Sequence, residues 1–168
     1  MHSVTSRLNT VFTFFGTTAA VLACLVALTD VIHNSDPPVD VQLKEVKRFS
    51  TLRGRQDQAV LSLSLKADLR SAFSWNTKQL FVYLQAEYET PDNELNQVSL
   101  WDTIIERRED ALLDMRSLRQ EYPLLDQGKN LRSLPINLTL VWNVMPKVGY
   151  LYARSKSFAV GFMPDEYL

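Results

Sequence analysis

In the stretch VLSLSLKADL, residues 60–69, every odd position is apolar, and the even positions from 62 to 68 are Ser, Ser, Lys and Asp. Successive side chains of a β-strand point to opposite faces, so this pattern predicts a strand with one buried face and one wet face. The stretch QLFVYLQAEYE, residues 79–89, repeats the alternation, although Phe81 and Tyr83 make its second face partly apolar. Residues 91–93, Pro-Asp-Asn, are expected to form the turn that ends it.

Further segments have the composition of strands and are separated by single glycines and prolines. They are residues 39–49, 98–105, 137–145 and 157–163. Several short strands between turn signals favour an antiparallel β-sandwich over a parallel α/β sheet, so residues 39–168 are predicted to form one all-β domain. Residues 107–122 fit helical spacing as well as strand alternation, and the apolar pattern leaves both alternatives open.

An uncharged and mostly apolar run, LNTVFTFFGTTAAVLACLVALT, occupies residues 8–29. A helix rises about 1.5 Å per residue, so a run of this length spans a hydrocarbon core of about 30 Å. We therefore predict a transmembrane signal-anchor helix at residues 9–32, preceded by a short tail at residues 1–8. Residues 33–38, which end in two prolines, are expected to form a stiff linker to the domain.

The charges beside the anchor predict its orientation. The amino terminus and Arg7 precede it, whereas Asp30, Asp36 and Asp40 follow it. The positive-inside rule then places the tail in the cytosol and the domain on the far side, which in a eukaryote is the secretory lumen. A cleaved signal peptide is the competing interpretation, but its apolar core should be only about 7–15 residues long and should precede a small-x-small site. Residues 27–29 fit such a site poorly, so the uncleaved anchor is favoured.

Threonines and small residues gather in the N-terminal half of the anchor. In lipid, a threonine hydroxyl bonds to a helix carbonyl or faces a neighbouring helix, where small residues permit close approach. We expect the face formed by Thr13, Gly16, Thr17 and Ala20 to contact partner helices. Cys24, the one cysteine, is interpreted as a small buried hydrophobe, with palmitoylation as the alternative.

The residue content excludes several kinds of active site. One cysteine rules out an internal disulfide and a thiolate zinc site. The two histidines, His2 and His33, flank the anchor, so the domain cannot contain a Ser-His-Asp triad or an imidazole metal site. Glu87 and Glu89 are interpreted as a solvated strand edge rather than an acid/base pair. No motif indicates a cofactor or a nucleic-acid partner, whereas a Ser-Lys dyad remains open because both residue types are numerous.

The sequence also contains a glycosylation motif and three tryptophans that bear on modification and on partner contact. Asn137-Leu138-Thr139 matches the N-x-[ST] motif, and the predicted orientation places it in the lumen, so Asn137 is a candidate glycosylation site. Trp142 lies on an alternating strand and is interpreted as a core residue. Trp75 and Trp101 are candidates for an interface, since tryptophan is enriched at binding hot spots.

Several blocks of sequence resemble the signal peptidase complex subunit 3 family. The resemblance covers nearly the whole chain and is weakest at residues 53–58, 106–120 and 148–157. The blocks are FSWNTKQLFVYL at 73–84, AEYET at 86–90, LNQVSLWD at 95–102, NLTL at 137–140 and WNVMP at 142–146.

The resemblance implies a non-catalytic accessory subunit of the endoplasmic reticulum signal peptidase complex, which supports cleavage of signal peptides from nascent secretory proteins. It implies a type II membrane protein whose partners are a catalytic serine protease subunit and the other subunits of that complex. It also favours a strand within residues 107–122. No catalytic residue is carried over, because the family's serine nucleophile belongs to the partner. A membrane-anchored lumenal binding module, such as a cargo receptor, and a Ser-Lys hydrolase remain as alternatives.

Overall fold

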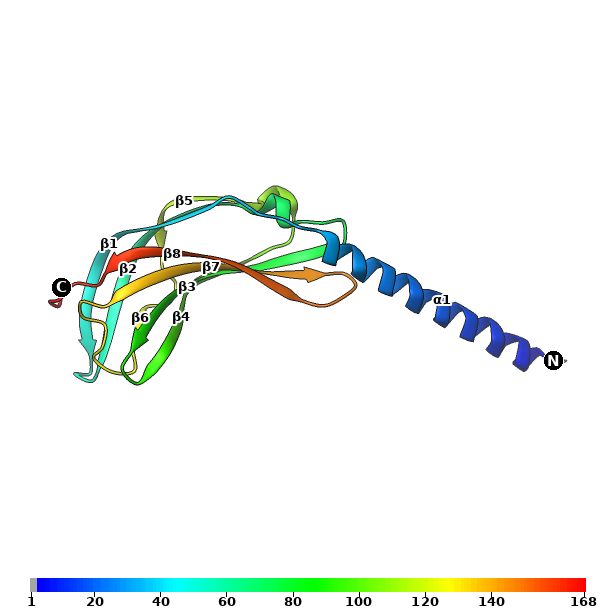
Figure 1. Ribbon diagram of the computed structural model, residues 1–168, viewed down its shortest axis with the longest axis horizontal. Helices are drawn as coiled ribbons and strands as arrows, with labels where there is room; N and C mark the ends of the chain where they lie inside the picture. The colour runs from blue at the N-terminus through cyan, green and yellow to red at the C-terminus, as the bar shows by residue number, and fades with distance from the viewer. Residues whose placement is uncertain (1–2) are drawn as a thin grey trace.

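The computed structural model describes residues 3–168 as an N-terminal helix followed by eight β-strands (Figure 1). Met1 and His2, at the start of the predicted tail, lie outside the described residues. Each of the six predicted strand segments overlaps an observed strand. The elements are α1 (Val4–Ile32), β1 (Val39–Leu52), β2 (Gln56–Asp68), η1 (Leu69–Ala72), β3 (Thr77–Thr90), β4 (Asn93–Ile105), η2 (Arg108–Ala111), β5 (Leu112–Arg119), β6 (Leu124–Leu125), β7 (Pro135–Pro146) and β8 (Tyr152–Phe162), where η marks a 3₁₀ turn.

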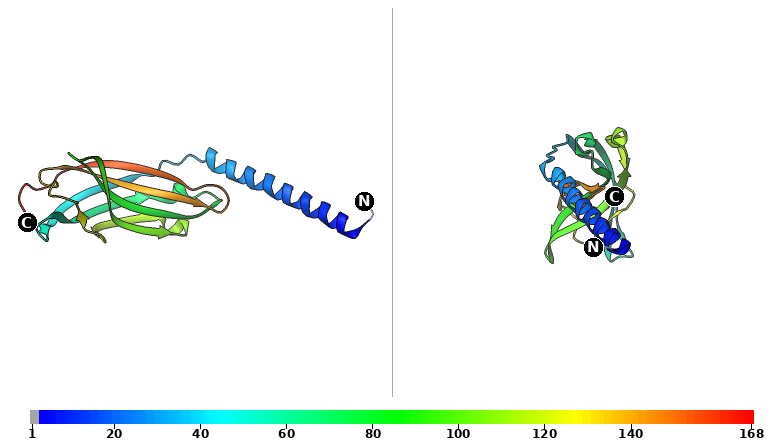
Figure 2. Two further views of the ribbon diagram at one scale, coloured as in Figure 1. Left: turned by 90° about the horizontal axis from the view of Figure 1, so that it is seen from below. Right: turned by 90° about the vertical axis from the view of Figure 1, so that its right-hand side faces the viewer.

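The strands form two antiparallel sheets, which the views in Figures 1 and 2 show packed against each other. One sheet has the order β1-β2-β5, with the short β6 beside β2, and the other has the order β4-β3-β7-β8. Inward-facing leucines from both sheets, among them Leu63, Leu84 and Leu140, are fully buried in one core. The predicted all-β antiparallel sandwich is therefore confirmed.

The outer face of β2 is drier than the alternation predicts. Lys66 is exposed, but Ser62 and Ser64 are each only 6% exposed. β2 lies between β1 and β5, and Ser62 pairs with Glu45 on one side and Arg119 on the other. Longer side chains on both neighbours leave little room for water above a serine, so the wet-face prediction is wrong at these two positions.

Residues 107–122 contain the turn η2 and the strand β5, which confirms the strand alternative for their second part. Ala111 is fully buried, and Leu113 and Met115 pack against the core, as strand alternation requires. Leu112, which helical spacing would bury, is 57% exposed. The two residues of β6 were not predicted, because a segment that short has no period to recognise.

The helix α1 begins at Val4 rather than at residue 9. Ser3 caps it, since the Ser3 hydroxyl oxygen accepts a hydrogen bond from the Ser6 amide at 3.3 Å. A helix can continue beyond the hydrocarbon core, so residues 9–32 remain the predicted spanning part. α1 projects from one end of the sandwich (Figures 1 and 2), and it is long and apolar enough to cross a membrane.

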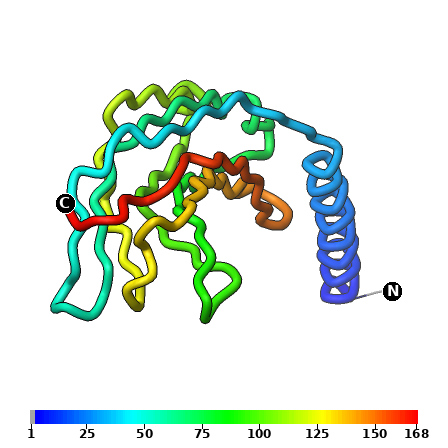
Figure 3. The backbone as a smooth tube through the Cα atoms, turned by 60° about the vertical axis from the view of Figure 1, so that its left-hand side comes forward, coloured from blue at the N-terminus to red at the C-terminus, as the bar shows by residue number. Residues whose placement is uncertain are grey.

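The opposite end of the sandwich is held together by a buried carboxylate. Asp57 Oδ1 accepts a hydrogen bond from the Tyr167 hydroxyl at 2.9 Å, and Oδ2 accepts one from the Leu131 amide at 3.2 Å. The guanidinium carbon of Arg132 lies 4.2 Å from the centre of the Tyr167 ring. The segment after β8 is thereby tied both to β2 and to the loop that precedes β7. Figure 3 shows the C-terminus at this end, away from α1.

Candidate interaction surfaces

The predicted partner-helix face lies on the part of α1 that extends away from the sandwich. Thr13 donates a hydrogen bond to the Asn9 carbonyl at 2.8 Å, and Thr17 donates one to the Thr13 carbonyl at 2.8 Å. Within the described chain, a Cβ added at Gly16 would meet no heavy atom within 4 Å beyond the adjoining helix backbone. Ala20 is exposed as well. The hydroxyls are satisfied within the helix, and the face is open to a neighbouring helix.

The last turn of α1 is bound to the domain through Asp30, which is 8% exposed. Asp30 Oδ2 accepts a hydrogen bond from Asn76 Nδ2 at 2.5 Å, and Oδ1 accepts one from the Ser74 hydroxyl at 3.0 Å. The C-terminal end of a helix carries a partial negative charge, which disfavours a carboxylate there, so these two donors offset an otherwise unfavourable position. His33 Nε2 adds a contact of 3.0 Å to the Ser71 carbonyl.

Asn76, which is 1% exposed, also binds the loop between β7 and β8. Its Nδ2 donates to the Val148 carbonyl at 2.7 Å, and its Oδ1 accepts from the Val148 amide at 3.2 Å. Its backbone carbonyl accepts from the Lys147 amide at 2.7 Å. One buried side chain thus joins α1, the β2–β3 loop and the β7–β8 loop. The linker is docked too, since Lys156 Nζ lies 2.6 Å from Asp36 Oδ1.

The three tryptophans lie in three different environments. Trp142 is 2% exposed and belongs to the core, as predicted. Trp101 is half-buried and lines a hollow of ≈ 460 Å³ between the edge strands β4 and β5, together with Ile104 and Met115. Trp75 is 64% exposed, in the loop beside the end of α1. Both candidate interface tryptophans therefore present surface that a partner can reach.

The candidate glycosylation site lies on the outer face of the β4-β3-β7-β8 sheet. Asn137 is exposed, whereas Thr139, two residues along β7, is 4% exposed. Thr139 Oγ1 lies 2.8 Å from Glu87 Oε2 and 2.9 Å from Ser157 Oγ. In the folded domain the threonine of the motif is therefore engaged by both neighbouring strands, while the asparagine side chain remains accessible.

Glu87 is not part of a solvated edge, and that interpretation is wrong for it. It lies on the central strand β3 and is half-buried, whereas Glu89 is exposed. Burial acts to raise the pKa of Glu87, but hydrogen bonds from Thr139, Gln97 and Gln85 together outweigh it and lower the pKa. The alternation placed Glu87 on the correct face but could not show that three donors converge on it.

The whole chain can be compared with known proteins. It matches the family model described as signal peptidase subunit over residues 1–166. The chain belongs to this family. It is 39% identical to signal peptidase complex subunit 3 of Gallus gallus and 37% identical to that of Homo sapiens, in each case over 99% of this chain and 97% of the relative. It is 36% identical to signal peptidase complex subunit 3 of Caenorhabditis briggsae over 90% of this chain and 87% of that relative.

Membership of the signal peptidase subunit family confirms the resemblance found in the sequence blocks. In the part of the chain that the structure describes, no three side chains of His, Cys, Asp or Glu are grouped so that they could hold a metal ion. The lysine ammonium groups of Lys147 and Lys156 donate to the backbone carbonyls of Trp75 and Pro37. Both lysines thus join segments of the chain to one another.

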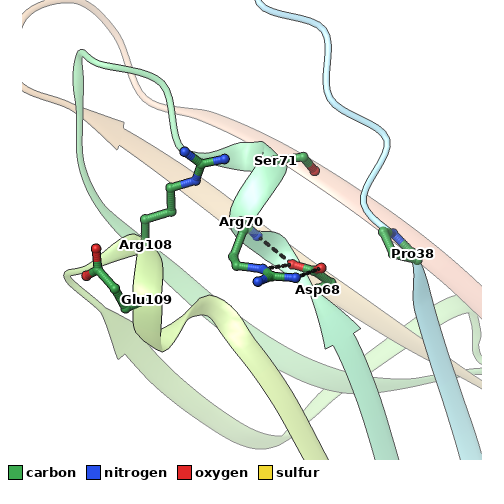
Figure 4. Close-up of a pocket in the computed structure, with 6 residues that line it drawn as sticks. All are labelled: Pro38, Asp68, Arg70, Ser71, Arg108 and Glu109. Atoms are coloured by element: carbon green, nitrogen blue, oxygen red, sulfur yellow. Dashed lines mark hydrogen bonds and ion pairs between the residues drawn. The ribbon is translucent and has the colours of Figure 1, made fainter.

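The chain also has a hollow of ≈ 590 Å³ beside the linker, next to the turns η1 and η2 (Figure 4). Arg70 Nε and Nη2 donate to the two carboxylate oxygens of Asp68, at 2.8 Å and 2.6 Å. That bidentate hydrogen bond lowers the pKa of Asp68 to about 2. Arg108 and Glu109 line the other side, as Figure 4 shows. The charges of Asp68 and Arg70 satisfy each other rather than converging on the hollow.

Sequence reasoning missed the residues that join the elements of this family member. Asp30 was interpreted only as a flanking charge, although its place directly after the uncharged run was a usable signal. Asn76 carried no such signal, because its side-chain partners lie 46 and 72 positions away in the sequence. The same holds for Asp57 and Leu131, which are 74 positions apart.

Proposed function

We propose that this chain is an accessory subunit of the signal peptidase complex in the endoplasmic reticulum membrane, and that it supports signal-peptide cleavage without catalysing it. The observation that carries the proposal is the match to signal peptidase subunits over residues 1–166, with relatives aligned from end to end. The catalytic residues then belong to a partner subunit, a serine protease.

The proposed topology is type II, with the N-terminus in the cytosol and residues 39–168 in the lumen. The flanking charges support it, since Arg7 lies on one side of α1 and acidic residues lie on the other. The exposed Asn137 offers a test, because a lumenal N-x-[ST] motif is accessible to the glycosylating enzyme. Glycosidase treatment should increase gel mobility, and Asn137→Gln should abolish that shift. A mobility unaffected by both would contradict a glycosylated lumenal Asn137.

We propose that the subunit acts by holding the catalytic domain of its partner in place. Asn76 and Ser74 bind Asp30, so the end of α1 and the sandwich are joined directly rather than by a loose tether. The face of Thr13, Gly16, Thr17 and Ala20 would pack against partner helices. Trp75 and Trp101 are the proposed contact aromatics outside the anchor. The sandwich would then hold the catalytic domain at a set height above the bilayer, where an extended substrate arrives.

Co-purification is the most informative experiment. The tagged full-length chain should bring down a serine protease subunit from solubilised endoplasmic reticulum membranes. Deleting residues 39–168 should reduce signal-peptide processing although the nucleophile is intact on the partner. Unimpaired processing by a complex that lacks this domain would refute the positioning role. Proteolysis by the purified chain alone would refute the non-catalytic assignment and favour the Ser-Lys hydrolase.

A further inference from the structure

Four apolar side chains are exposed at the end of the sandwich where α1 enters. Trp75 is 64% exposed, Val148 40%, Tyr150 60% and Leu151 64%. They come from two loops that are far apart in sequence, the β2–β3 loop and the β7–β8 loop. We call these four residues the helix-side patch. A group of large exposed apolar side chains in one place marks a surface that is covered in the working protein.

The exposure of Trp75 is imposed by a tightly bonded turn. The Ser74 amide donates to Thr77 Oγ1 at 2.9 Å, and the Thr77 amide donates to the Ser74 carbonyl at 3.2 Å. The carbonyl of Trp75 itself accepts from Lys147 Nζ at 3.3 Å. These bonds fix the backbone on both sides of Trp75. The side chain of Trp75 therefore points away from the core.

The β7–β8 loop lies directly against the helix. A Cβ built on Gly149 would be 3.4 Å from Ala27 Cβ and 3.6 Å from Ala27 Cα. Gly149 also has a φ of +129°, a conformation that side-chain-bearing residues rarely adopt. Figure 1 shows the loop between β7 and β8 beside the end of α1. The loop backbone is therefore set at the level of Ala27, with Val148, Tyr150 and Leu151 around this contact.

Ala27 lies inside the uncharged run that ends at Thr29. At about 1.5 Å of rise per residue, it is roughly 3 Å short of the end of that run. The run is about as long as a hydrocarbon core is thick, so this depth corresponds to the boundary between acyl chains and headgroups. A loop in contact with Ala27 reaches the same boundary.

We propose, on the basis of the membrane anchoring proposed above, that the helix-side patch inserts into the interfacial layer of the bilayer as a second membrane contact beside α1. Tryptophan and tyrosine favour this layer because their rings are apolar and their N–H and O–H groups reach the headgroups. Lys147 and Arg154 are exposed at the same end and can bind lipid phosphates. The helix-side patch thus contacts the lipid surface. Because α1 and the patch both contact the bilayer, together they set the tilt of the sandwich relative to the membrane.

This contact also accounts for the enclosure of Asp30. A carboxylate at this depth would lose its hydration, and transfer of an unpaired charge out of water is costly. The donors Asn76 and Ser74 supply hydrogen bonds in place of water. The loops that form the patch are thus the same loops that shield the one acidic group of α1.

Site-directed spin labelling of the full-length chain in phosphatidylcholine vesicles tests the proposal. Cys24 is the one cysteine, so its label reports directly on α1. Leu151→Cys and Leu95→Cys, both in a Cys24→Ala background, compare the patch with a matched residue, since Leu95 is 60% exposed near the β3–β4 turn at the other end. Collisions with oxygen, which concentrates in lipid, and with a water-soluble nickel chelate distinguish the two environments.

Lipid contact predicts a several-fold higher ratio of oxygen to nickel collisions at position 151 than at position 95, with the highest ratio at Cys24. Equal ratios at positions 151 and 95, together with a lipid-embedded Cys24, would overturn the patch but leave the anchor intact. Low collision rates with both reagents at position 151 would indicate a covering protein surface and would also overturn the proposal. A water-exposed Cys24 would instead refute the anchoring on which the proposed function rests.

Tryptophan fluorescence gives a second measurement without a label. Vesicles of brominated lipid should quench part of the emission of the unmodified chain. That quenched part should disappear in Trp75→Phe and persist in Trp101→Phe, because Trp101 lines the hollow between β4 and β5. Quenching of the same size in both variants would overturn the assignment of Trp75 to the bilayer.

Discussion

At the end of the sandwich beside α1, Asp30 accepts hydrogen bonds from Asn76 and Ser74. At the opposite end, Asp57 accepts them from Tyr167 and Leu131. Both ends thus use a buried aspartate to bring together segments distant in sequence. At the α1 end, Trp75, Tyr150 and Leu151 are exposed beside the helix. At the other end Leu95 and Phe162 are exposed too, together with charged turn residues, among them Arg53, Asp92 and Lys129.

The aspartate clusters contribute to stability at both ends, whereas the exposed residues bear on what each end contacts. Both aspartate clusters are means of closing a sandwich, since buried acceptors must be satisfied wherever loops cover the core. Apolar side chains are exposed at both ends, so it is the position of Trp75, Tyr150 and Leu151 beside α1 that favours membrane contact at that end. Charged turns face water without cost, while exposed aromatic rings at the α1 end gain free energy only when something apolar covers them.

Loss of the cluster at the far end should have the largest effect. Asp57→Ala leaves the Tyr167 hydroxyl and the Leu131 amide without their acceptor, so the free energy of unfolding should fall by about 3 kcal/mol. Denaturant unfolding of the full-length chain in detergent measures it. Asp92→Ala, in the exposed β3–β4 turn, is the control and should change the unfolding free energy by less than about 0.5 kcal/mol. A similar loss in both variants would contradict a special role for Asp57.

A smaller and more local effect is expected at the α1 end. Asn76→Asp places a second carboxylate against Asp30, and two like charges at hydrogen-bond distance cannot both ionise without cost. The variant also lacks the amide N–H groups that bind Asp30 and the Val148 carbonyl, so it should lose the hydrogen bonds that hold the β7–β8 loop.

Hydrogen exchange measures this loss. At neutral pH the Lys147 and Val148 amides should exchange about tenfold faster than in the unmodified chain, or more, while amides beside Asp57 should be unaffected. Asn93→Asp, in the turn at the far end, is the matched control. Faster exchange at both ends would show that the two clusters form one cooperative unit. They would then not stabilise the two ends independently.

Thr139 lies on β7, between the two ends of the sandwich. Thr139→Val removes the hydroxyl that bonds Glu87 and Ser157 and should cost about 1 kcal/mol of unfolding free energy, whereas Thr139→Ser should keep most of it. Thermal unfolding of the deglycosylated protein measures it, so that loss of a glycan does not contribute. An equal loss in the serine variant would assign the effect to the methyl group instead.

The smallest effect concerns Asp68. Its folded pKa of about 2 lies below the ordinary value of 3.8. The Arg70 contact therefore stabilises the fold at pH values above 3.8, and this stabilisation is lost as the pH falls toward 2. The carboxyl carbon of Asp68, followed by NMR, should titrate near pH 2. In Arg70→Met the midpoint should return toward the ordinary value. An unchanged midpoint in that variant would remove Arg70 as the cause.

Secondary-structure elements were predicted correctly where the apolar or alternating sequence pattern was long. The 22-residue run and the ten-residue alternation at residues 60–69 have many repeats, and the structure contains both elements. β6 has two residues and no period, and it was missed. Ser62 and Ser64 were assigned to the correct face but not to the correct exposure, because exposure depends on the neighbouring strands that flank them.

The N-terminal apolar helix, the main strands, the lack of histidine in the strand-rich part and, through the matching blocks, the signal peptidase subunit family could all be read from the amino-acid sequence. These follow from composition and short-range period, which are local properties of the chain. Three features became visible only in the folded chain: Asn76 encloses Asp30, Gly149 lies against Ala27, and Trp75 is exposed. Each of these depends on backbone positions set by strand pairing, which brings together residues dozens of positions apart.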